Sequence, residues 1–329
     1  MDGILNIHKA TGMTSHDVVA KIRKLLQEKR VGHAGTLDPL ASGVLPICVG
    51  QATRVAEYLS ESGKAYLATI VFGTVTDTYD AEGTILRTAN TDHLTLQMVE
   101  EALEHFVGPQ MQMPPRYSAI KLQGQPAYKR VRAGEEIKLA PRPVVIHSLE
   151  IAPPGRDKSG PYATLQGNPP SVTLAIECGK GTYIRSLAYD LGEYLGCGAY
   201  LATLVRTRSG PFHLSESVTL EQLSSALAEE VGDHSRVRID PARGITLDGL
   251  FKYLYPADKA LEGYPALVLD AATVERVQHG NAFHYLRDEQ VLPTNGIARV
   301  YSDDGHFVAI AKWDAAQEVW QPRKVFRCS

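Results

Sequence analysis

The stretch HAGTLDPLASGVL, residues 33–45, places one carboxylate, Asp38, among glycines and apolar side chains. An Asp-Pro pair often begins a turn, and that structural explanation stays open. A carboxylate surrounded by leucine and valine, however, loses hydration unless a cation or several donors keep it ionised. Arg185 is the type of partner that would do this, because a guanidinium is planar and always charged. We therefore predict that Asp38 either begins a turn or is a chemical group paired with such a cation.

A second acidic group lies in FGTVTDTYDAEG, residues 72–83, where Asp77 and Asp80 invite a calcium interpretation. The ligands of an EF-hand loop fall at alternating positions, and here Tyr79 and Ala81 occupy two of them. This pattern favours a polar turn after a strand. The four cysteines are scattered without a C-x-x-C pair, so we expect reduced thiols and no metal. No G-x-x-x-x-G-K-[ST] or G-x-G-x-x-G precedes a helix, and no cofactor is expected.

A basic segment, residues 116–142, carries seven basic side chains against two acidic ones and also holds Tyr117 and Tyr128. Basic residues interleaved with aromatics suit a phosphate backbone and unstacked bases. The formal net charge of −3 argues mildly against a nucleic-acid binder, since such proteins gain affinity by neutralising phosphates. An RNA-binding surface and an ordinary solvated loop therefore both remain open.

Hydrophobic periodicity predicts the elements that must position these groups. Strands are expected at 65–72, 144–151 and 171–178, with helices at 14–29, from 184 onward, at 219–231 and at 270–278, and a hairpin around Asp304-Gly305. Arg185 then lies near a strand-to-helix junction. The Gly/Pro-rich stretch 153–170 is predicted to be a surface loop or hairpin tip.

The length of 329 residues predicts one large domain followed by a small one, with the boundary in the irregular stretch 233–265. No apolar run approaches the ~20 residues that a membrane span needs. The N-terminal residues lack the basic and apolar regions of a secretory signal. We therefore expect a cytoplasmic protein that does not enter a membrane.

Several motifs taken together resemble the bacterial tRNA pseudouridine-55 synthases, the TruB family, from Gly3 to about Phe212. They are GILNIHKATGMTSHDVV, VGHAGTLDPLASGVLPICVGQATR, KAYLATIVFGTVTDTYDAEG, PPRYSAIKLQGQPAYKRVRAGE and CGKGTYIRSLAYDLGEYLGCGAYLATLVRTRSG. The C-terminal portion resembles a PUA domain, a small β-rich RNA-binding module, through LDAATVERVQHGNAF and GIARVYSDDGHFVAIAKW. Two positions depart from the family's pattern, since Ala10 replaces a proline after Lys9, and Val205 replaces the first arginine of L-R-R-T.

The resemblance implies an α+β fold, the pseudouridine synthase fold, with a central, mostly antiparallel mixed sheet. It implies a catalytic domain over 1–260 with an RNA-binding insertion at about 114–143. A small β-rich PUA-like RNA-binding domain is expected over 261–329.

The resemblance also assigns roles to single residues. Asp38 matches the catalytic aspartate, Arg185 the arginine paired with it, and Tyr66 the tyrosine that stacks on the flipped base and is proposed to take part in its proton transfer. Tyr183 and Leu204 match residues lining the uridine pocket. The remaining predicted substrate-binding residues are His33, which helps fill the space left by the extruded base, and Lys9, Arg116, Lys121, Lys129 and Arg130.

The implied function is that of an isomerase that converts uridine 55 in the T arm of tRNA to pseudouridine, with base flipping and no cofactor. We expect a monomer that needs no guide RNA. A tRNA-folding chaperone role is a further alternative, alone or alongside catalysis. A guide-RNA-dependent synthase of the archaeal and eukaryotic branch shares the aspartate motif and is a second rival. A nucleoside hydrolase is less favoured, because the aspartate cluster that would bind calcium is missing.

Overall fold

A computed structural model of the chain describes residues 1–118, 120–122, 124–152, 165, 167–231, 252–285 and 296–326. Most of the described chain surrounds a ten-stranded sheet with the order β14-β1-β3-β12-β4-β11-β10-β7, in which β2 also pairs with β3 and β13 with β12. Neighbouring strands in the described sheet run antiparallel, except for β12 and β3, which are parallel. The parallel contact divides the sheet into two halves.

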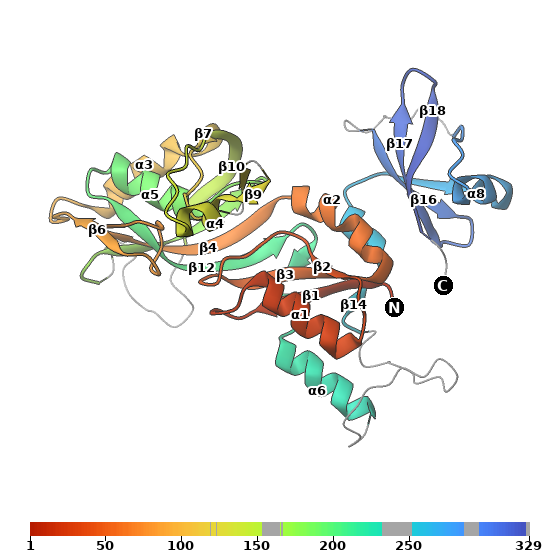
Figure 1. Ribbon diagram of the computed structural model, residues 1–329. Helices are drawn as coiled ribbons and strands as arrows, with labels where there is room; N and C mark the ends of the chain where they lie inside the picture. The colour runs from red at the N-terminus through yellow and green to blue at the C-terminus, as the bar shows by residue number, and fades with distance from the viewer. Residues whose placement is uncertain are drawn as a thin grey trace.

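The first half contains the two strands that flank the aspartate motif and two further strands. They are β1 (Gly3–Lys9), β2 (Val31–His33), β3 (Ser42–Val49) and β14 (Leu254–Tyr255). Helices α1 (Ser15–Leu26) and α6 (Leu220–Val231) lie on this half, and α2 (Ala56–Glu61) leads into the second (Figure 1). The Asp38 loop, residues 34–41, connects β2 to β3.

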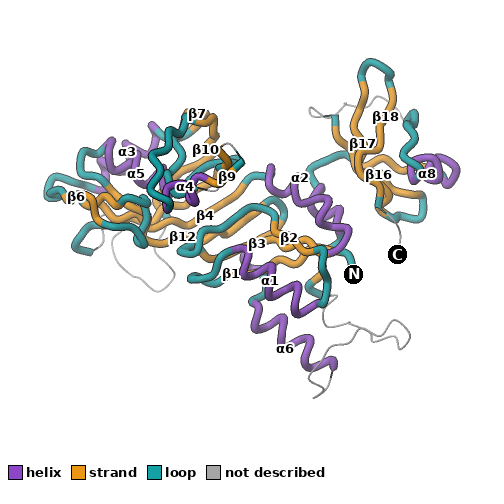
Figure 2. Tube along the Cα trace, viewed as in Figure 1, coloured by secondary structure: helices purple, strands orange, loops and turns teal. Residues whose placement is uncertain are grey.

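The second half contains six described strands, two of which carry the predicted site residues Tyr66 and Leu204. They are β4 (Lys64–Phe72), β7 (Gly108–Gln112), β10 (Arg142–Ile151), β11 (Ser171–Cys178), β12 (Ala199–Ser209) and β13 (Phe212–His213). Strands β5 (Thr74–Thr76) and β6 (Ile85–Thr88) form a separate hairpin. Helices α3 (Leu96–His105) and α5 (Ile184–Tyr194) cover this half (Figure 2).

The basic segment joins β7 to β10, two strands that are neighbours at the edge of the sheet. It contains the short hairpin of β8 (Lys121–Leu122) and β9 (Gln125–Pro126), followed by helix α4 (Ala127–Arg132). Because Gln112 and Arg142 pair directly, the segment leaves and re-enters the sheet at one point. It is therefore an insertion carried by the edge of the second half.

The C-terminal part has its own sheet of four strands, in the order β15-β16-β17-β18. The strands are β15 (Ala266–Leu269), β16 (Ile297–Ser302), β17 (Phe307–Asp314) and β18 (Val319–Val325), with α8 (Ala271–Gln278) alongside. Contacts with the larger part include the Lys324–Glu57 ion pair and the Arg54 guanidinium, which lies 5.4 Å from the Phe326 ring centre. The small sheet is thus docked against α2 and the turn before it.

The predicted fold class is confirmed, because the chain is α+β with a large mixed, mostly antiparallel sheet and a small C-terminal four-stranded sheet. The predicted strand at 171–178 is β11 with the same bounds, and β4 begins one residue earlier than predicted. The Thr14–Asp17 capping box opens α1 as predicted, but the helix ends at Leu26, where Gln27 takes a left-handed conformation.

Some predictions fall partly or wholly on residues outside the described part. They include most of the loop at 153–170 and much of the proposed boundary region 233–265. In the described chain, the predicted boundary at 260/261 lies within a 3-10 turn, Ala257–Leu261. No described helix is both long and apolar enough to span a bilayer.

Candidate active site

Asp38 and Arg185 meet at the boundary between the two halves of the sheet. Arg185 Nη2 lies 2.9 Å from Asp38 Oδ2. Asp38 is supplied by the Asp38 loop of the first half, whereas Arg185 lies in the first turn of α5 in the second half. The arginine side chain is only 7% exposed, while that of Asp38 is 41% exposed. The cation is therefore fixed within the protein, and the carboxylate faces the open side.

Arg185 has contacts with other groups besides Asp38. Its Nη1 lies 3.4 Å from Oδ2 of Asp80, a carboxylate that is 5% exposed. The carbonyl oxygens of Thr78 and Tyr117 accept further hydrogen bonds from Nη1 and Nη2 at 3.4 and 3.1 Å. A guanidinium can satisfy several acceptors at once because its donors lie in one plane. Two carboxylates and two carbonyls thus orient one arginine.

Asp80 is itself fixed by the turn that follows β5. Its Oδ1 accepts a hydrogen bond from the Thr78 hydroxyl at 2.5 Å and another from the Glu82 amide at 3.1 Å. The ring of Tyr79, next to it, stacks on Tyr189, one helical turn beyond Arg185, with 4.1 Å between ring centres. This polar turn therefore positions the arginine.

The Asp38 loop is anchored on its other side by the first strand and the start of α1. The buried Ser15 hydroxyl donates to the Leu37 carbonyl at 3.0 Å and accepts from the Leu37 amide at 2.8 Å. The Gly12 amide donates to the Pro39 carbonyl at 2.9 Å. Lys9 is fully buried, and its Nζ donates to the carbonyls of Ala10, Met13 and Pro39 at 2.9, 2.7 and 3.4 Å.

The burial of Lys9 bears on its predicted role in binding substrate. Burial lowers its pKa to about 8, although the nearby Asp38 carboxylate opposes this shift. In this structure the ammonium supports the Asp38 loop, and its contact with a substrate stays a prediction.

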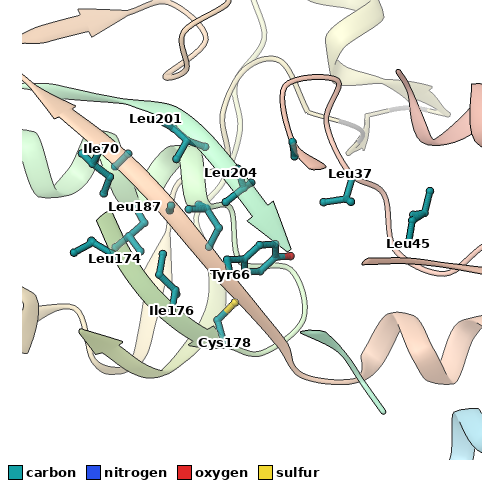
Figure 3. Close-up of a cluster of buried hydrophobic side chains, with 14 of the residues drawn as sticks. Leu37, Leu45, Tyr66, Ile70, Leu174, Ile176, Cys178, Leu187, Leu201 and Leu204 are labelled. Atoms are coloured by element: carbon teal, nitrogen blue, oxygen red, sulfur yellow. The ribbon is translucent and has the colours of Figure 1, made fainter. Parts of the chain in front are cut away.

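A cavity of about 260 Å³ lies beside the ion pair. Its wall includes five residues that the sequence pointed to, namely Asp38, Tyr66, Tyr183, Arg185 and Leu204. Figure 3 shows Tyr66 at the end of a cluster of buried apolar side chains, with its hydroxyl directed to the side where Leu37 lies. The pocket therefore joins an apolar wall to a charged wall, an arrangement that suits a flat, polar-edged base.

The apolar residues around Asp38 do not shield its carboxylate, in contrast to the expectation from the sequence. Leu37 and Leu45 are buried in one core cluster and Val44 in another. Their side chains thus pack into the body of the protein, while the carboxylate stays partly exposed. Val44 and Leu45 are neighbours in β3, and they enter different core clusters because neighbouring side chains of a strand point to opposite faces of the sheet.

The phenol of Tyr66 and the ammonium of Lys64 lie on the same face of β4, two residues apart, and both line the cavity. Burial raises the pKa of Tyr66, and the nearby Arg206 guanidinium opposes that rise. Burial also lowers the pKa of Lys64 to about 8, and its Nζ donates to the carbonyls of Ser60 and Ser62. Tyr66 is therefore a neutral phenol near neutral pH.

His33 lies outside the cavity wall, at the end of β2. Its ring makes an edge-on contact with His16, with 5.4 Å between ring centres, and none of the described residues forms a hydrogen bond with its buried Nδ1. Burial is the main reason that the pKa of His33 falls to about 4, and the charges of His16 and Arg206 add to the effect. His33 is therefore neutral at physiological pH, which suits a ring that stacks within RNA.

The predicted RNA-binding residues of the basic segment are spread over its surface. Arg116 and Lys129 are exposed, and Arg130 pairs with Glu135 at 2.6 Å. The side chain of Lys121 lies outside the described part. The segment contacts the ion pair through the Tyr117 carbonyl, which accepts a hydrogen bond from Arg185.

Three residues at this site were not identified from the sequence: Lys64, Asp80 and Arg206. Asp80 was considered only as a calcium ligand, and the other two were merely quoted within motifs. No local sequence pattern marks a buried charge, because its partners come from distant segments of the chain. In the described chain no group of three or more His, Cys, Asp or Glu side chains is arranged to hold a metal.

Family models match nearly the whole chain. Residues 23–184 match the TruB family pseudouridylate synthase N-terminal domain. Residues 185–262 match the tRNA pseudouridylate synthase B C-terminal domain, and residues 265–326 match the pseudouridine synthase II TruB C-terminal domain.

Similar proteins share this length and architecture. The tRNA pseudouridine synthase B of Dehalococcoides mccartyi strain 195 is 41% identical over 326 residues, covering 99% of this chain and 97% of the relative. That of Clostridium kluyveri is 39% identical over 313 residues, covering 94% and 95%. A solved structure of a Cbf5–Nop10–Gar1 complex contains a similar chain, with a TM-score of 0.70 and 26% identity, covering 99% of this chain and 85% of that one. The chain therefore belongs to the TruB family of pseudouridylate synthases, which confirms the predicted resemblance and the predicted isomerase class.

Proposed function

We propose that this protein isomerises uridine 55 in the T arm of tRNA to pseudouridine, with Asp38 as the essential group and no cofactor. The observation that carries the proposal is the Asp38–Arg185 pair, 2.9 Å apart, on the wall of a cavity that also contains Tyr66 and Leu204. Relatives that match nearly the full length of the chain are named tRNA pseudouridine synthase B. The site supplies one reactive carboxylate and a place for one base.

The reaction breaks the N1–C1′ glycosidic bond, turns the detached uracil and joins C5 to C1′. C5 then loses its proton and N1 gains one, so that the product is an isomer of the substrate. A glycosidase normally uses two carboxylates. Uracil can delocalise its own negative charge as it leaves, so one carboxylate is sufficient here. Asp80 is buried against Arg185 and is 5% exposed, so it is not placed to reach the sugar. Asp38 is thus the carboxylate that acts on the substrate.

The charges around Asp38 suit a carboxylate that is ionised and can still react with the substrate. Arg185 binds one carboxylate oxygen, Oδ2, and no hydrogen bond from the described residues reaches the other, Oδ1. Because Arg185 also pairs with Asp80, its positive charge is shared between two carboxylates. Asp38 could then attack C1′, attack the pyrimidine ring or remove the C2′ proton, and all three routes use the ionised form.

The target uridine must leave the stack before Asp38 can reach it, at a cost of a few kcal/mol. Stacking of the base on Tyr66 would recover about 1–3 kcal/mol. The neutral ring of His33 would take the space that the base leaves in the RNA. Exposed Arg116 and Lys129 of the basic segment would contact the phosphate backbone, which is how basic side chains gain affinity for RNA. The C-terminal four-stranded sheet would provide a second contact with the tRNA.

We expect the protein to act in the cytoplasm as a monomer on RNA alone, without a guide RNA. The basic segment and the C-terminal sheet would also serve a tRNA-folding chaperone role, which does not require Asp38. An Asp38→Asn protein that still accelerates tRNA folding would separate the two activities.

The decisive experiment uses tRNA transcripts labelled with tritium at C5 of uridine, without metal or cofactor. We expect the wild type to release tritium from a single T-arm uridine and Asp38→Asn to release none, with both proteins binding tRNA equally. Asp38→Asn keeps the size of the side chain, and we therefore expect this variant to fold. Its binding of tRNA is the control for folding. Full activity in Asp38→Asn would contradict the assignment, and activity that appears only with added RNA would favour a guide-dependent enzyme.

A further inference from the structure

Arg206 is a fully buried arginine at the boundary between the two halves of the sheet. Its Nε donates to the Val44 carbonyl at 2.7 Å, its Nη2 to the Gly35 carbonyl at 3.0 Å and its Nη1 to the Thr36 carbonyl at 3.4 Å. Within the described chain it has no carboxylate partner. Burial of a guanidinium without a counter-ion costs free energy of folding. The role of the three carbonyl contacts therefore needs an explanation.

The three carbonyls belong to the two sides of the Asp38 loop. Gly35 and Thr36 precede Asp38, and Val44 follows it in β3. Gly35 has a φ of +89°, and a Cβ added there would lie 3.5 Å from the Lys64 side chain and 3.6 Å from Arg206 Nη1. One planar side chain thus fixes the entrance and the exit of the loop, as five rigidly arranged donors allow.

The backbone of Arg206 lies where the two halves of the sheet meet. It pairs with Gly43 of β3 on one side and with Tyr66 of β4 on the other. The parallel pairing of β12 with β3 involves only Val205–Ser42 and Arg206–Gly43 among the described residues. A Cβ at Gly43 would lie 2.3 Å from the Arg206 carbonyl oxygen, so the strands approach here as closely as glycine permits.

Arg206 also contacts the base-binding wall. Residues directly opposite in neighbouring strands project from the same face of a sheet, so the Arg206 and Tyr66 side chains lie together. The positive charge of Arg206 lowers the pKa of Tyr66, against the larger upward effect of burial. The guanidinium thus bonds to the Asp38 loop, and its side chain lies beside the tyrosine in the wall of the same cavity.

We infer that Arg206 is a positioning residue that fixes the distance between the Asp38 loop and Tyr66, so that the carboxylate and the base-stacking ring face the same bound uridine. It acts through these two groups and does not itself touch the reacting atoms. The inference rests on the proposed function, because it concerns the same site. A misplacement of about 1 Å in such a constellation costs on the order of 100-fold in rate.

The test compares Arg206→Lys and Arg206→Met with the control Arg208→Lys. Arg208 lies on the same strand, but it pairs with Ala65 after a bulge and forms a half-exposed ion pair with Glu177. Single-turnover tritium release and tRNA binding are measured for each protein. We expect the rate to fall at least fivefold in Arg206→Lys and about 100-fold in Arg206→Met, with the Kd for tRNA within threefold of wild type and the control unchanged.

A second readout does not depend on activity. With 3-fluorotyrosine at position 66, the fluorine resonance of the tRNA-free protein is followed as the pH is raised. Removal of a positive charge raises the pKa of a phenol. The fluorotyrosine at position 66 should therefore titrate at higher pH in Arg206→Met than in the wild type, and at unchanged pH in Arg208→Lys. A purely structural loss of stability would not shift this titration selectively.

The outcomes separate the inference from the proposed function. A wild type that releases no tritium overturns the proposed function, while the fluorine titration still decides whether Arg206 acts on Tyr66. A rate in Arg206→Lys within fivefold of wild type, or an unchanged titration in Arg206→Met, overturns the inference. If Arg206→Met does not fold, Arg206→Lys decides alone. A fall of its single-turnover rate by less than fivefold from wild type then overturns the inference.

Discussion

The Asp38 loop and the basic segment differ in how their polar groups are held. In the loop, the carbonyls of Gly35, Leu37 and Pro39 accept hydrogen bonds from buried side chains that come from three other segments. In the basic segment, Arg116 and Lys129 are exposed to solvent. The loop is therefore preorganised, whereas the side chains of Arg116 and Lys129 extend into solvent.

This difference follows from what each region would do. Bond making requires a carboxylate held close to its target position, because rate depends steeply on geometry. Contact with a phosphate backbone requires charge, and it tolerates movement of long side chains. Arg185 of α5 links the two regions, because it pairs with Asp38 and donates a hydrogen bond to the Tyr117 carbonyl. A movement of the segment at Tyr117 would therefore reach the ion pair.

Among the substitutions that test this difference, Arg185→Lys should have the largest effect. One ammonium cannot reach Asp38, Asp80 and the two carbonyls that the guanidinium contacts together. We expect the single-turnover rate to fall about 100-fold, equivalent to ~3 kcal/mol of transition-state stabilisation, with little change in tRNA binding. Tritium release and filter binding measure the two quantities. A near-normal rate would show that a diffuse positive charge is enough at this position.

Ser15→Ala tests the anchoring of the Asp38 loop from outside the pocket. It removes both hydrogen bonds with the Leu37 backbone in a buried place. We expect a loss of about 1–3 kcal/mol in the free energy of unfolding and about a tenfold lower rate. Urea unfolding and tritium release are the measurements. Ser217→Ala, which removes a bond to the Leu214 carbonyl outside the loop, is the control and should leave the rate unchanged.

Arg116→Gln and Lys129→Gln test the other side of the contrast. Each removes one exposed charge, so the Kd for tRNA should rise several-fold and the slope of log K against log salt should fall by about 1. The rate at saturating enzyme should stay the same. Lys24→Gln, on the exposed face of α1, is the matched control. A lower rate at saturation would mean that the basic segment takes part in assembling the site.

The smallest expected effect concerns His33 and pH. Its pKa is about 4 in the folded protein against 6.5 in the unfolded chain. Between these pH values the unfolded chain binds a proton at His33 that the folded protein does not bind. Protonation therefore favours the unfolded chain, and the free energy of unfolding decreases as the pH falls below 6.5. From pH 7 to 5 the loss is on the order of 1 kcal/mol. Urea unfolding at both pH values should show a smaller loss in His33→Gln, and equal losses would contradict the burial of a neutral ring.

Much of the fold followed from local patterns. Alternating apolar residues and β-branched side chains placed β4 and β11 within one residue, and the Thr219–Gln222 cap marked the start of α6. The hairpin around Asp304-Gly305 was found as β16 and β17. These signals are readable because they depend on neighbours within a few residues. The end of α1 was placed too late, since Gln27 has no local feature that marks a helix end.

By itself, the sequence determined the family, the fold class and the type of chemistry, because several motifs each carried a recognisable pattern. It also pointed to Asp38 and Arg185, which the structure brings to 2.9 Å. Tertiary structure alone decided that Asp80 shares this arginine, that Lys9 lies under the Asp38 loop and that Arg206 joins the loop to Tyr66. These roles arise from contacts between residues far apart in the chain. The cost of a buried charge is set by such contacts, and the order of the residues does not show them.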